Sequence, residues 1–426
     1  MMKTINIAIL GMGTVGSGVY RVLETEGEYI AHKTGLHINV KKVLALDYAI
    51  EIPESLKAAS MDEIANDAEI DVVVELMGGI EPAKTFILQA FAGGKSVVSA
   101  NKQMISLHWP ELEAAANANN AKFYFEASVG GGIPLLRTVK ESLQANTFSS
   151  IFAIINGTTN YILTRMTEEG EDYGEVLKDA QDLGYAEADP TADVDGFDSM
   201  YKLSILSSLV FHSRLPVENI YREGIRNITK DDIQYAREFG YVIKLLAIGK
   251  RTGNDVELRV HPTLVPRNHP LASVRDSFNA VLLNGSAVGE VMLYGRGAGD
   301  LPTASAVVSD IIHAGLKAED TYVMFENIED KVSPILHFEK DWVSSYYIRL
   351  HLLDVPGTLA KVAKAMGDNG ISISSVIQKE PQRQGEYAAV IFLTHEAREN
   401  DVQKALDQIS QLHEVGEIGN LIRVES

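Results

Sequence analysis

The sequence predicts an α/β protein in three parts: a doubly wound parallel sheet, an α+β domain and a small ferredoxin-like βαββαβ domain. Over residues 1–130, apolar strand-like runs alternate with helical patterns, which is typical of a parallel sheet. Residues 131–325 mix strands and helices around glycine-rich turns. Residues 345–426 show the order strand, helix, strand, strand, helix, strand, which is the split βαββαβ motif.

The first domain begins with a buried-type strand at 4–10, followed by a helix over roughly 14–26. The same alternation predicts strands at 38–47, 71–76 and 95–99 and helices at 82–92 and 109–119. In the second domain strands are expected at 151–156, 241–249, 255–264, 278–284 and 288–294. An apolar helix is expected at 198–211.

A further helix, at 302–316, is expected to return from the second domain and pack on the first, so that these two domains form one interlocked body. A charged linker near 325–344 leads to the third domain, which we expect to be a separable appendage. Its strands are predicted at 346–354, 371–378, 387–395 and 418–424, and its helices at 357–368 and 398–412.

The composition excludes several classes of protein. The chain of 426 residues carries a formal net charge of −20, so it lacks the basic surface that binds nucleic acids or anionic membranes. No apolar run approaches the roughly 18 residues of a membrane span, and no signal-peptide cleavage site follows the first strand. Cysteine is absent, which removes disulfides, thiolate metal sites and a cysteine nucleophile. These features favour the cytoplasm.

Gly11, Gly13 and Gly16 form a G-x-G-x-x-G motif between the first strand and the first helix. In this context the first glycine permits the tight turn, the second lets a pyrophosphate approach the backbone, and the third lets helix and strand pack closely. The N-terminal N–H groups of the helix, at Thr14 and Val15, then face the phosphates. The motif predicts a Rossmann-type dinucleotide site, with a purely structural turn as the alternative.

Asp47 ends the second strand. An acid at this place hydrogen-bonds the adenosine ribose and favours NAD, whereas a nearby arginine favours NADP. Leu46 precedes it, and Lys41 and Lys42 lie too far back along the strand to be its partners. A surface acid without function is the alternative.

Six carboxylates crowd the segment 182–198. Such charges repel one another unless something cationic lies among them. An EF-hand is excluded: with Gly196 as its sixth residue, Lys202 would stand at the twelfth, where calcium needs a bidentate glutamate. The choice that remains is between a site for a ligand's ammonium group and a solvated acidic loop. The six residues are Asp182, Glu187, Asp189, Asp193, Asp195 and Asp198.

The helix at 198–211 contains no charged residue besides Asp198 and Lys202, which share one face at i,i+4 spacing. We therefore expect a buried helix with one ion pair at its N-terminal end. Burial and a carboxylate partner shift the pKa of a lysine in opposite directions, so a lysine held in this way can donate or accept a proton. An ordinary buried ion pair is the alternative. Lys102, which follows the strand at 95–99, is expected at the ligand crevice or on the plain surface.

Taken together, these residues resemble homoserine dehydrogenases of the monofunctional type with a C-terminal ACT domain. The resemblance covers essentially the whole chain and implies NAD(P)-dependent interconversion of L-homoserine and L-aspartate 4-semialdehyde, in threonine and methionine biosynthesis. It rests on the segments 11–16, 100–102, 156–160, 184–190 and 193–198 and on Lys202.

The resemblance also implies roles for single residues. Lys202 is the general acid that protonates the aldehyde oxygen, Asp198 orients it and touches the substrate, and Lys102 is a second cation near the reacting oxygen and the cofactor. Glu187 binds the substrate's ammonium group. The pocket is lined by Tyr185, Thr158 and Asp193, and the nicotinamide is bordered by Gly184, Ala298 and Gly299.

The family binds a monovalent cation, typically sodium, for which the resemblance implies oxygen ligands. These are the carboxylate of Glu126 and the carbonyls of Val129, Gly131 and Ile133. Members that use NADP often carry a basic residue where this chain has Leu46 and Asp47. The choice between NADP and NAD therefore stays open, although the family favours NADP.

The third domain resembles an ACT domain through the turn Asp354-Val355-Pro356-Gly357 before its first helix. Such domains pair and bind amino acids beside this turn. The resemblance implies threonine as the effector and a homodimer or homotetramer, with a pure dimerisation module as the alternative.

Two rival functions remain from the sequence. The first is a dehydrogenase or reductase for another amino acid or semialdehyde, which would need a different arrangement of acids around Lys202. The second is a non-catalytic amino-acid sensor with a retired dinucleotide domain. That function predicts the loss of Lys102, Asp198 or Lys202, all of which are present.

Overall fold

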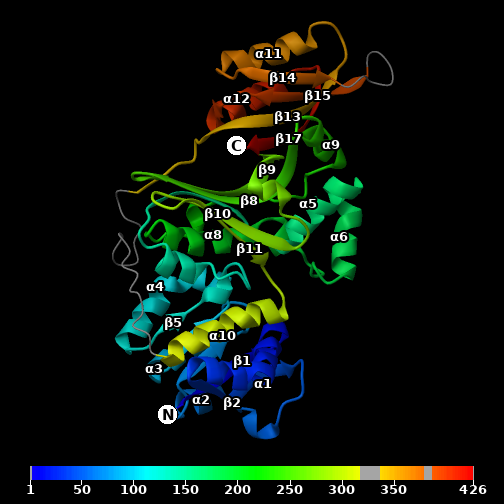
Figure 1. Ribbon diagram of the computed structural model, residues 1–426. Helices are drawn as coiled ribbons and strands as arrows, with labels where there is room; N and C mark the ends of the chain where they lie inside the picture. Colours follow the sequence, from blue (N-terminus) through cyan, green and yellow to red (C-terminus); the bar gives the residue numbers. More distant parts are fainter. Residues whose placement is uncertain (1, 317–335, 379–385, 426) are drawn as a thin grey trace. The chain divides into compact units, whose positions relative to one another are not determined.

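The computed structural model describes residues 2–316, 336–378 and 386–425, and its internal contacts divide the chain into two compact units (Figure 1). Unit 1 contains the described parts of 1–155, 198–220 and 278–336, and unit 2 those of 156–197, 221–277 and 337–426. The boundaries of the three domains expected from the sequence stay a prediction.

Unit 1 is built on the parallel, doubly wound sheet that the sequence predicts. Its strands lie in the order β2-β1-β3-β4-β5, and all the neighbours run parallel. The strands are β1 (Lys3–Met12), β2 (Leu36–Tyr48), β3 (Val72–Glu75), β4 (Ser96–Ser99) and β5 (Phe123–Tyr124). The helices between them are α1 (Thr14–Thr34), α2 (Met61–Ala65), α3 (Ala83–Ala92) and α4 (Lys102–Ala118), and short helical turns lie at Glu54–Leu56, Glu126–Ser128 and Thr138–Ser142.

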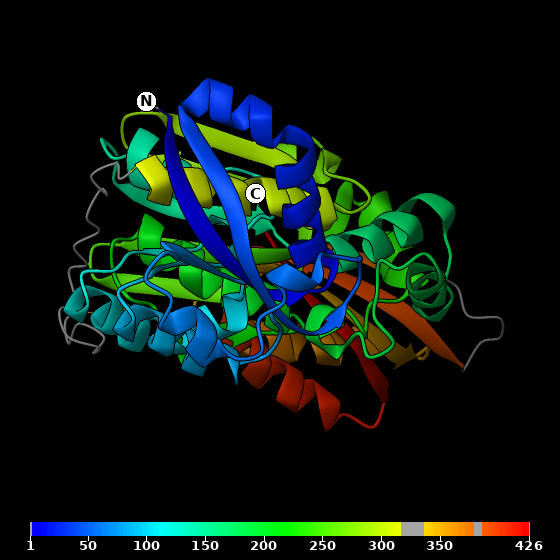
Figure 2. The same ribbon diagram turned by 90° about the horizontal axis from the view of Figure 1, so that it is seen from below.

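The rest of unit 1 comes from distant parts of the chain. Strands β6 (Phe148–Ile154), β10 (Phe278–Gly285) and β11 (Gly289–Arg296) form an antiparallel group, and α8 (Phe197–Val210) contributes its residues from Asp198 onward. Helix α10 (Asp300–Leu316), yellow in Figure 2, packs against α1. Gly18 makes this contact close, because a Cβ there would lie 2.8 Å from the carbonyl oxygen of Asp300. A one-turn helix, Val217–Asn219, follows α8 within unit 1.

Unit 2 contains a sheet in the order β8-β9-β17-β13-β15-β14. Its strands are β8 (Tyr241–Thr252), β9 (Asp255–Pro266), β13 (Val343–Leu353), β14 (Ile373–Gln378), β15 (Tyr387–Thr394) and β17 (Val415–Val424), with short β7 (Tyr221–Arg222), β12 (His337–Phe338) and β16 (Ala397–Arg398). Its helices are α5 (Gly157–Glu169), α6 (Tyr173–Asp182), α7 (Thr191–Val194), α9 (Lys230–Glu238), α11 (Thr358–Asp368) and α12 (Glu399–Ser410), with a short turn at Pro270–Ser273. Helices α11 and α12 pack their apolar faces on one side of this sheet.

The predicted βαββαβ order is confirmed by β13, α11, β14, β15, α12 and β17. This C-terminal part is not, however, the separable appendage expected from the sequence. Strand β17 pairs in parallel with β9, so both belong to one sheet. Glu425 binds Arg259 of β9 at 2.5 Å, and Asp232 of α9 binds Arg349 of β13 at 2.8 Å. Backbone pairing and buried ion pairs therefore join the C-terminal part to the rest of unit 2.

Several element boundaries differ from those expected. Helix α4 begins at Lys102 rather than near residue 109, because the side chain of Asn101 caps it by accepting a hydrogen bond from the Met104 N–H. The segment 182–198 contains the short helix α7. Of the linker expected at 325–344, residues 325–335 lie outside the described residues. None of the described helices is both long enough and apolar enough to cross a membrane.

Candidate active site

The glycine motif forms the turn between β1 and α1. Gly11 has a φ of +93°, a conformation that favours glycine. A Cβ on Gly16 would lie 2.1 Å from the carbonyl oxygen of Gly11, so the helix passes too close to the strand for any side chain. Around Gly13 the space within 4 Å of a Cβ is open. The turn therefore has the three properties that let a pyrophosphate approach the backbone at a helix N-terminus.

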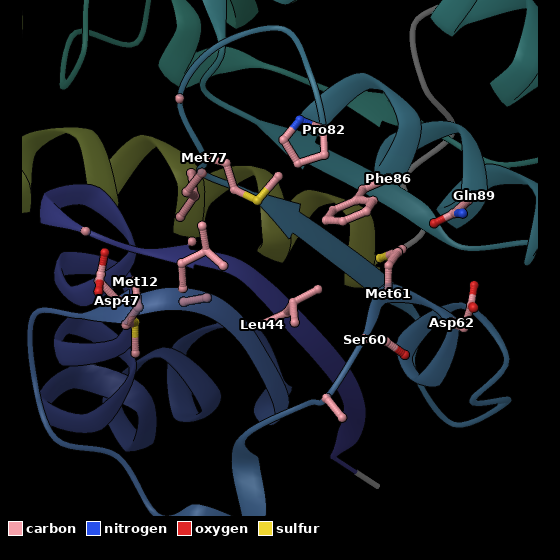
Figure 3. A pocket seen from close by; sticks show the side chains of 17 residues that line it. Met12, Leu44, Asp47, Ser60, Met61, Asp62, Met77, Pro82, Phe86 and Gln89 are labelled. Carbon is pink, nitrogen blue, oxygen red and sulfur yellow. The ribbon is translucent and has the colours of Figure 1, made fainter.

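A cavity of about 750 Å³ opens beside this turn (Figure 3). Gly11 and Gly13 line it together with the segments 44–47 and 59–62 and with residues of 76–89. Asp47 lies at one end of the cavity and Asp62 at the other, with apolar side chains such as Phe86 between them. Such a cavity, mostly apolar with a few polar groups, suits an aromatic ring system attached to a sugar.

The cavity carries negative charge. Asp47 and Asp62 line it, and no lysine or arginine of the described residues does so. Leu46, which precedes Asp47 near the end of β2, is fully exposed. Two lysines close in sequence are paired elsewhere: Lys42 Nζ lies 2.7 Å from Glu63, and Lys57 Nζ lies 2.5 Å from Glu54.

Glu75, which no sequence motif marks, is the last residue of β3 and is fully buried. Its carboxylate accepts hydrogen bonds from the hydroxyl of Ser99 at 2.6 Å and from the N–H of Met77 at 2.8 Å. Burial nevertheless raises the pKa of Glu75 to about 7. It ties the carboxyl end of β3 to that of β4, just before Lys102. The available signal was a single acid within the apolar run DVVVEL.

Asp198 lies between two lysines. Its Oδ2 accepts a hydrogen bond from Lys202 Nζ at 2.7 Å, and its Oδ1 lies 3.2 Å from Lys102 Nζ. Lys202 also donates to the carbonyl of Ile155 at 2.8 Å. Asp198 and Lys202 are buried, whereas Lys102 is partly exposed. The ion pair expected from the i,i+4 spacing is present, and the fold adds a second ammonium group. Two cations around one carboxylate leave an excess of positive charge that suits a developing alkoxide.

The position of Lys102 follows from its local structure. It is the first residue of α4, and the preceding Asn101 caps the helix. The Asn101 side-chain N–H₂ group also donates to the carbonyl of Gly79 at 2.6 Å. The start of the helix is thus anchored at the carboxyl ends of the parallel strands, where ligands bind in sheets of this type.

A second group of predicted residues lies in unit 2. The hydroxyl of Thr158 donates to the carbonyl of Tyr185 at 2.7 Å and to Asp193 at 3.1 Å. Asn156 donates to the other Asp193 oxygen at 2.7 Å, and the rings of Tyr161 and Tyr185 lie 4.7 Å apart. The structure thus brings Thr158, Tyr185 and Asp193 together at the N-terminus of α5.

Most carboxylates of the acidic segment have partners within the protein. Asp195 binds Arg226 at 2.5 Å, and Asp189 accepts a hydrogen bond from the Thr191 N–H at 3.1 Å. Glu187 differs: its side chain is exposed, and its carboxylate has no partner among the described residues. Of the predicted ligands for an ammonium group in unit 2, Glu187 therefore has the carboxylate that is open to a ligand.

The glycines proposed to border the nicotinamide lie in both units. Gly184, with a φ of +76°, follows α6 in unit 2. Ala298 and Gly299 belong to unit 1, where Gly299 has a φ of +118° directly before α10. Gly131 packs against this turn, because a Cβ there would lie 2.4 Å from the carbonyl oxygen of Gly297.

The loop proposed to hold a cation contains several oxygen atoms. Both oxygens of the buried Glu126 carboxylate accept backbone hydrogen bonds, from Leu136 at 2.9 Å and Arg137 at 2.7 Å. The carbonyls of the other three proposed ligands accept no hydrogen bond from the described residues. Burial raises the pKa of Glu126, and that of the neighbouring Asp310 to about 7. The donors are thus oxygens, as a hard cation requires. Among the described residues, no group of three or more His, Asp or Glu side chains is arranged so that it could hold a metal ion.

Comparisons with known proteins cover the whole chain. The family model for homoserine dehydrogenase matches residues 134–312, that for its NAD-binding domain matches 11–126, and that for the ACT domain matches 346–414. A homoserine dehydrogenase of Synechocystis is 44% identical over 99% of this chain and 100% of its own. One of Bacillus subtilis is 38% identical over 100% of this chain and 99% of its own.

Solved structures agree with these matches. The crystal structure of a homoserine dehydrogenase from Thiobacillus denitrificans is 39% identical, covers 100% of this chain and 99% of its own, and has a TM-score of 0.90. A hyperthermophilic archaeal homoserine dehydrogenase in complex with NADPH is 29% identical over 75% of this chain and 100% of its own, with a TM-score of 0.63. The matches in sequence and in fold lead to one conclusion: the chain belongs to the homoserine dehydrogenase family of NAD(P)-dependent oxidoreductases.

Proposed function

We propose that the chain interconverts L-homoserine and L-aspartate 4-semialdehyde with Lys202 as the residue that transfers the proton. The observation that carries the proposal is the position of Asp198 between the ammonium groups of Lys102 and Lys202. A nicotinamide, when bound, would supply hydride to the aldehyde carbon or accept it from homoserine. Lys202 donates a proton to the aldehyde oxygen in reduction and takes the hydroxyl proton in oxidation.

The neighbours of Lys202 have supporting roles. Asp198 orients its ammonium group, which the carbonyl of Ile155 holds from another side. Lys102 supplies a second positive charge, which stabilises the negative charge that develops on the substrate oxygen. Lys102 is partly exposed, so a ligand can reach its side chain.

The proposed substrate-binding residues of unit 2 differ in whether their side chains already have partners within the protein. Glu187 binds the ammonium group of the amino acid, since its carboxylate is exposed and open to a ligand. Asp193 and Thr158 bind each other at 3.1 Å, so they shape the pocket as one network, and Tyr185 extends it through the carbonyl that Thr158 binds.

The cavity beside Gly11, Gly13 and Gly16 would hold the dinucleotide, and the N–H groups of Thr14 and Val15 would bind its pyrophosphate. We propose that NAD binds this cavity more tightly than NADP. Asp47 can accept hydrogen bonds from the ribose hydroxyls, whereas a 2′-phosphate there would meet the Asp47 carboxylate with no cationic side chain on the wall. The preference for NADP in the family does not carry over, because Leu46 replaces the basic residue.

A sodium ion is proposed in the loop formed by Glu126, Val129, Gly131 and Ile133. Their oxygens are of the kind that the ion takes, and the ion would brace the loop that packs against the turn at Gly297.

The C-terminal ACT domain is proposed to bind threonine as a feedback effector, and the active form to be a homodimer or homotetramer in the cytoplasm. Gly357, with a φ of +96°, forms the turn before α11 where an amino acid would bind. Threonine inhibition and sedimentation equilibrium test these two points.

Steady-state kinetics test the proposed reaction. We expect L-homoserine to be oxidised with both dinucleotides and more efficiently with NAD. 4-Hydroxybutyrate, which lacks the ammonium group, should show a much lower kcat/KM. Equal kcat/KM values for the two alcohols would contradict the role of Glu187, and the absence of turnover with homoserine would overturn the proposal.

A further inference from the structure

A second cavity, of about 460 Å³, lies within unit 2 and apart from every residue assigned above. Its walls come from α5, from the end of α9, from the start of β8 and from the segment 267–275. The residues that line it are Thr164, Thr167, Glu168, Arg237, Val242, Lys244, Arg267, Ala272, Ser273 and Arg275.

The charge of this cavity is opposite to that of the whole chain. Four cationic side chains and a single carboxylate line it, although the chain carries a net charge of −20. Arg275 lies 3.1 Å from the carboxylate, Glu168. The side chains of Arg237 and Arg267 form no hydrogen bond or ion pair with any described residue. Cations that converge in this way repel one another unless an anion joins them.

Lys244 gives the cavity a buried cation. Its side chain is only 4% exposed, and its Nζ donates to the Asn160 side-chain oxygen at 2.9 Å and to the carbonyl of Val274 at 2.6 Å. Both partners are neutral, and the third hydrogen of the ammonium group has no partner among the described residues. Burial lowers the pKa of Lys244 to about 8.

Three other buried cations of the chain have a carboxylate in direct contact, whereas Lys95 is held by two backbone carbonyls. Arg349 has a carboxylate at 2.8 Å, Arg423 at 2.6 Å and Lys202 at 2.7 Å. Lys244 has no such contact, and a buried charge without a counter-ion is costly. An anion in the cavity would therefore stabilise Lys244 as well as the two arginines.

We propose that this cavity is a binding site for a small phosphorylated metabolite, separate from the dinucleotide and substrate sites. Guanidinium groups bind phosphoryl oxygens through paired hydrogen bonds. A phosphoryl group carries nearly two negative charges and three acceptor oxygens, so it can satisfy two arginines and the free ammonium hydrogen together. A single carboxylate offers one charge and two oxygens.

The site is connected to the C-terminal part of unit 2 through α9. Arg237 lies near the end of this helix, and Asp232 of the same helix accepts hydrogen bonds from Arg349 at 2.8 Å and from Tyr347 at 2.9 Å. A ligand that binds Arg237 would stabilise α9 and with it the attachment of the ACT domain. Slower amide hydrogen exchange in α9 is the expected sign of binding.

Calorimetric titration of the full chain with inorganic phosphate and with pyrophosphate tests the proposal. A saturating concentration of NAD fills the dinucleotide cavity beforehand, and the ionic strength is held constant. We expect saturable binding to one site per chain. Replacing both exposed arginines, Arg237→Gln with Arg267→Gln, should weaken it about tenfold or more, because charge-assisted hydrogen bonds are lost.

Arg398→Gln is the matched control, since it removes an exposed arginine outside the cavity whose partner is Asp341. It should leave phosphate binding unchanged. Lys244→Met, a separate variant of similar side-chain length, should also weaken binding. The proposal is overturned if no phosphate binds, if NAD displaces it, or if the double variant binds it as tightly as the unaltered chain does. Homoserine turnover is measured in parallel, so that a failure of the phosphate site is distinct from a failure of the proposed reaction.

Discussion

The ammonium groups of Lys102 and Lys202 share one carboxylate, that of Asp198. Lys202 donates to one oxygen at 2.7 Å, and Lys102 lies 3.2 Å from the other. Lys202 is buried and Lys102 is partly exposed. Because the two ammonium groups differ in their access to solvent, they suit different chemical roles. The buried one is suited to transfer a proton, and the exposed one to stabilise charge.

Lys202→Ala is expected to lower kcat by about 10²- to 10⁴-fold, the usual contribution of a general acid or base. Dinucleotide binding should stay nearly the same, because the residue does not line the dinucleotide cavity. Stopped-flow measurement of hydride transfer and fluorescence titration of the cofactor check the two parts. Lys178→Ala, at an exposed position on α6, is the control. Normal kcat in the Lys202 variant would show that another group transfers the proton.

Glu187→Gln is expected to raise the KM for homoserine by about tenfold, because the amide oxygen still accepts a hydrogen bond but lacks the charge that strengthens it. Little change in kcat is expected. Removal of binding shared by ground state and transition state has this signature. Asp182→Asn, an exposed acid of the same segment, should leave both constants as they are. An unchanged KM for the Glu187 variant would remove this residue from the ammonium site.

Leu46→Arg is expected to shift the ratio of kcat/KM values toward NADP by about tenfold, because a guanidinium at the end of β2 can bind the 2′-phosphate. The residue is fully exposed, so the substitution should not affect folding. Leu107→Arg, at an exposed leucine that does not line the cavity, is the matched control. If the ratio of kcat/KM for NADP to that for NAD is unchanged in the Leu46 variant, the ribose 2′-position of the bound cofactor does not lie near residue 46.

The stability of unit 1 should fall as the pH rises from about 4.5 to about 7. The pKa of Glu75 is raised to about 7 in the folded chain from an ordinary value of 4.5. Between these values the folded chain holds a proton that the unfolded chain has lost, so the free energy of unfolding decreases with pH, by about 3 kcal/mol for this group. Asp310, with its pKa raised to about 7, adds to the same trend.

Glu75→Gln should remove a large part of this pH dependence, as measured by urea unfolding at pH 5 and pH 8. Glu26→Gln, at an exposed glutamate of α1, should leave it unchanged. A stability that rises between these pH values would contradict the assignment of a neutral, buried Glu75.

Removal of residues from 341 onward is expected to destabilise the whole of unit 2, not merely to abolish an effector response. Strand β9 would lose β17, and the buried carboxylate of Asp232 would lose Arg349. A buried charge left without its partner costs about 3–5 kcal/mol. Size-exclusion chromatography and thermal unfolding should show aggregation or a lower Tm. A monodisperse, fully active truncated protein would contradict this prediction.

Local sequence patterns predicted the parts of the fold that depend on near neighbours. The turn at Gly11 to Gly16 and the contact between Asp198 and Lys202 follow from spacings of a few residues, because a strand, a turn or a helix brings such residues together by itself. The start of α4 at Lys102 was missed, although Asn101 is a good helix cap.

Contacts between distant segments left no local signal. The pairing of β17 with β9, the approach of Lys102 to Asp198 and the basic cavity around Lys244 all depend on how the chain returns on itself. The burial of Glu75 could not be predicted, because the sequence of an apolar strand does not indicate whether a single acid at its end is buried or exposed. The proposed cation loop relies on backbone carbonyls, whose positions no side chain reveals.

The pairing of β17 with β9 has a consequence for synthesis on the ribosome. The sheet of unit 2 gains a central strand only when residues 415–424 have left the exit tunnel, long after β8 and β9 have been made. Until then the part of β9 that pairs with β17, at Thr263 and Leu264, is open to other chains, and an open strand edge is a known route to aggregation. The nascent chain is therefore expected to need protection by chaperones during this interval, and slow translation of the residues between β9 and β17 should increase that need.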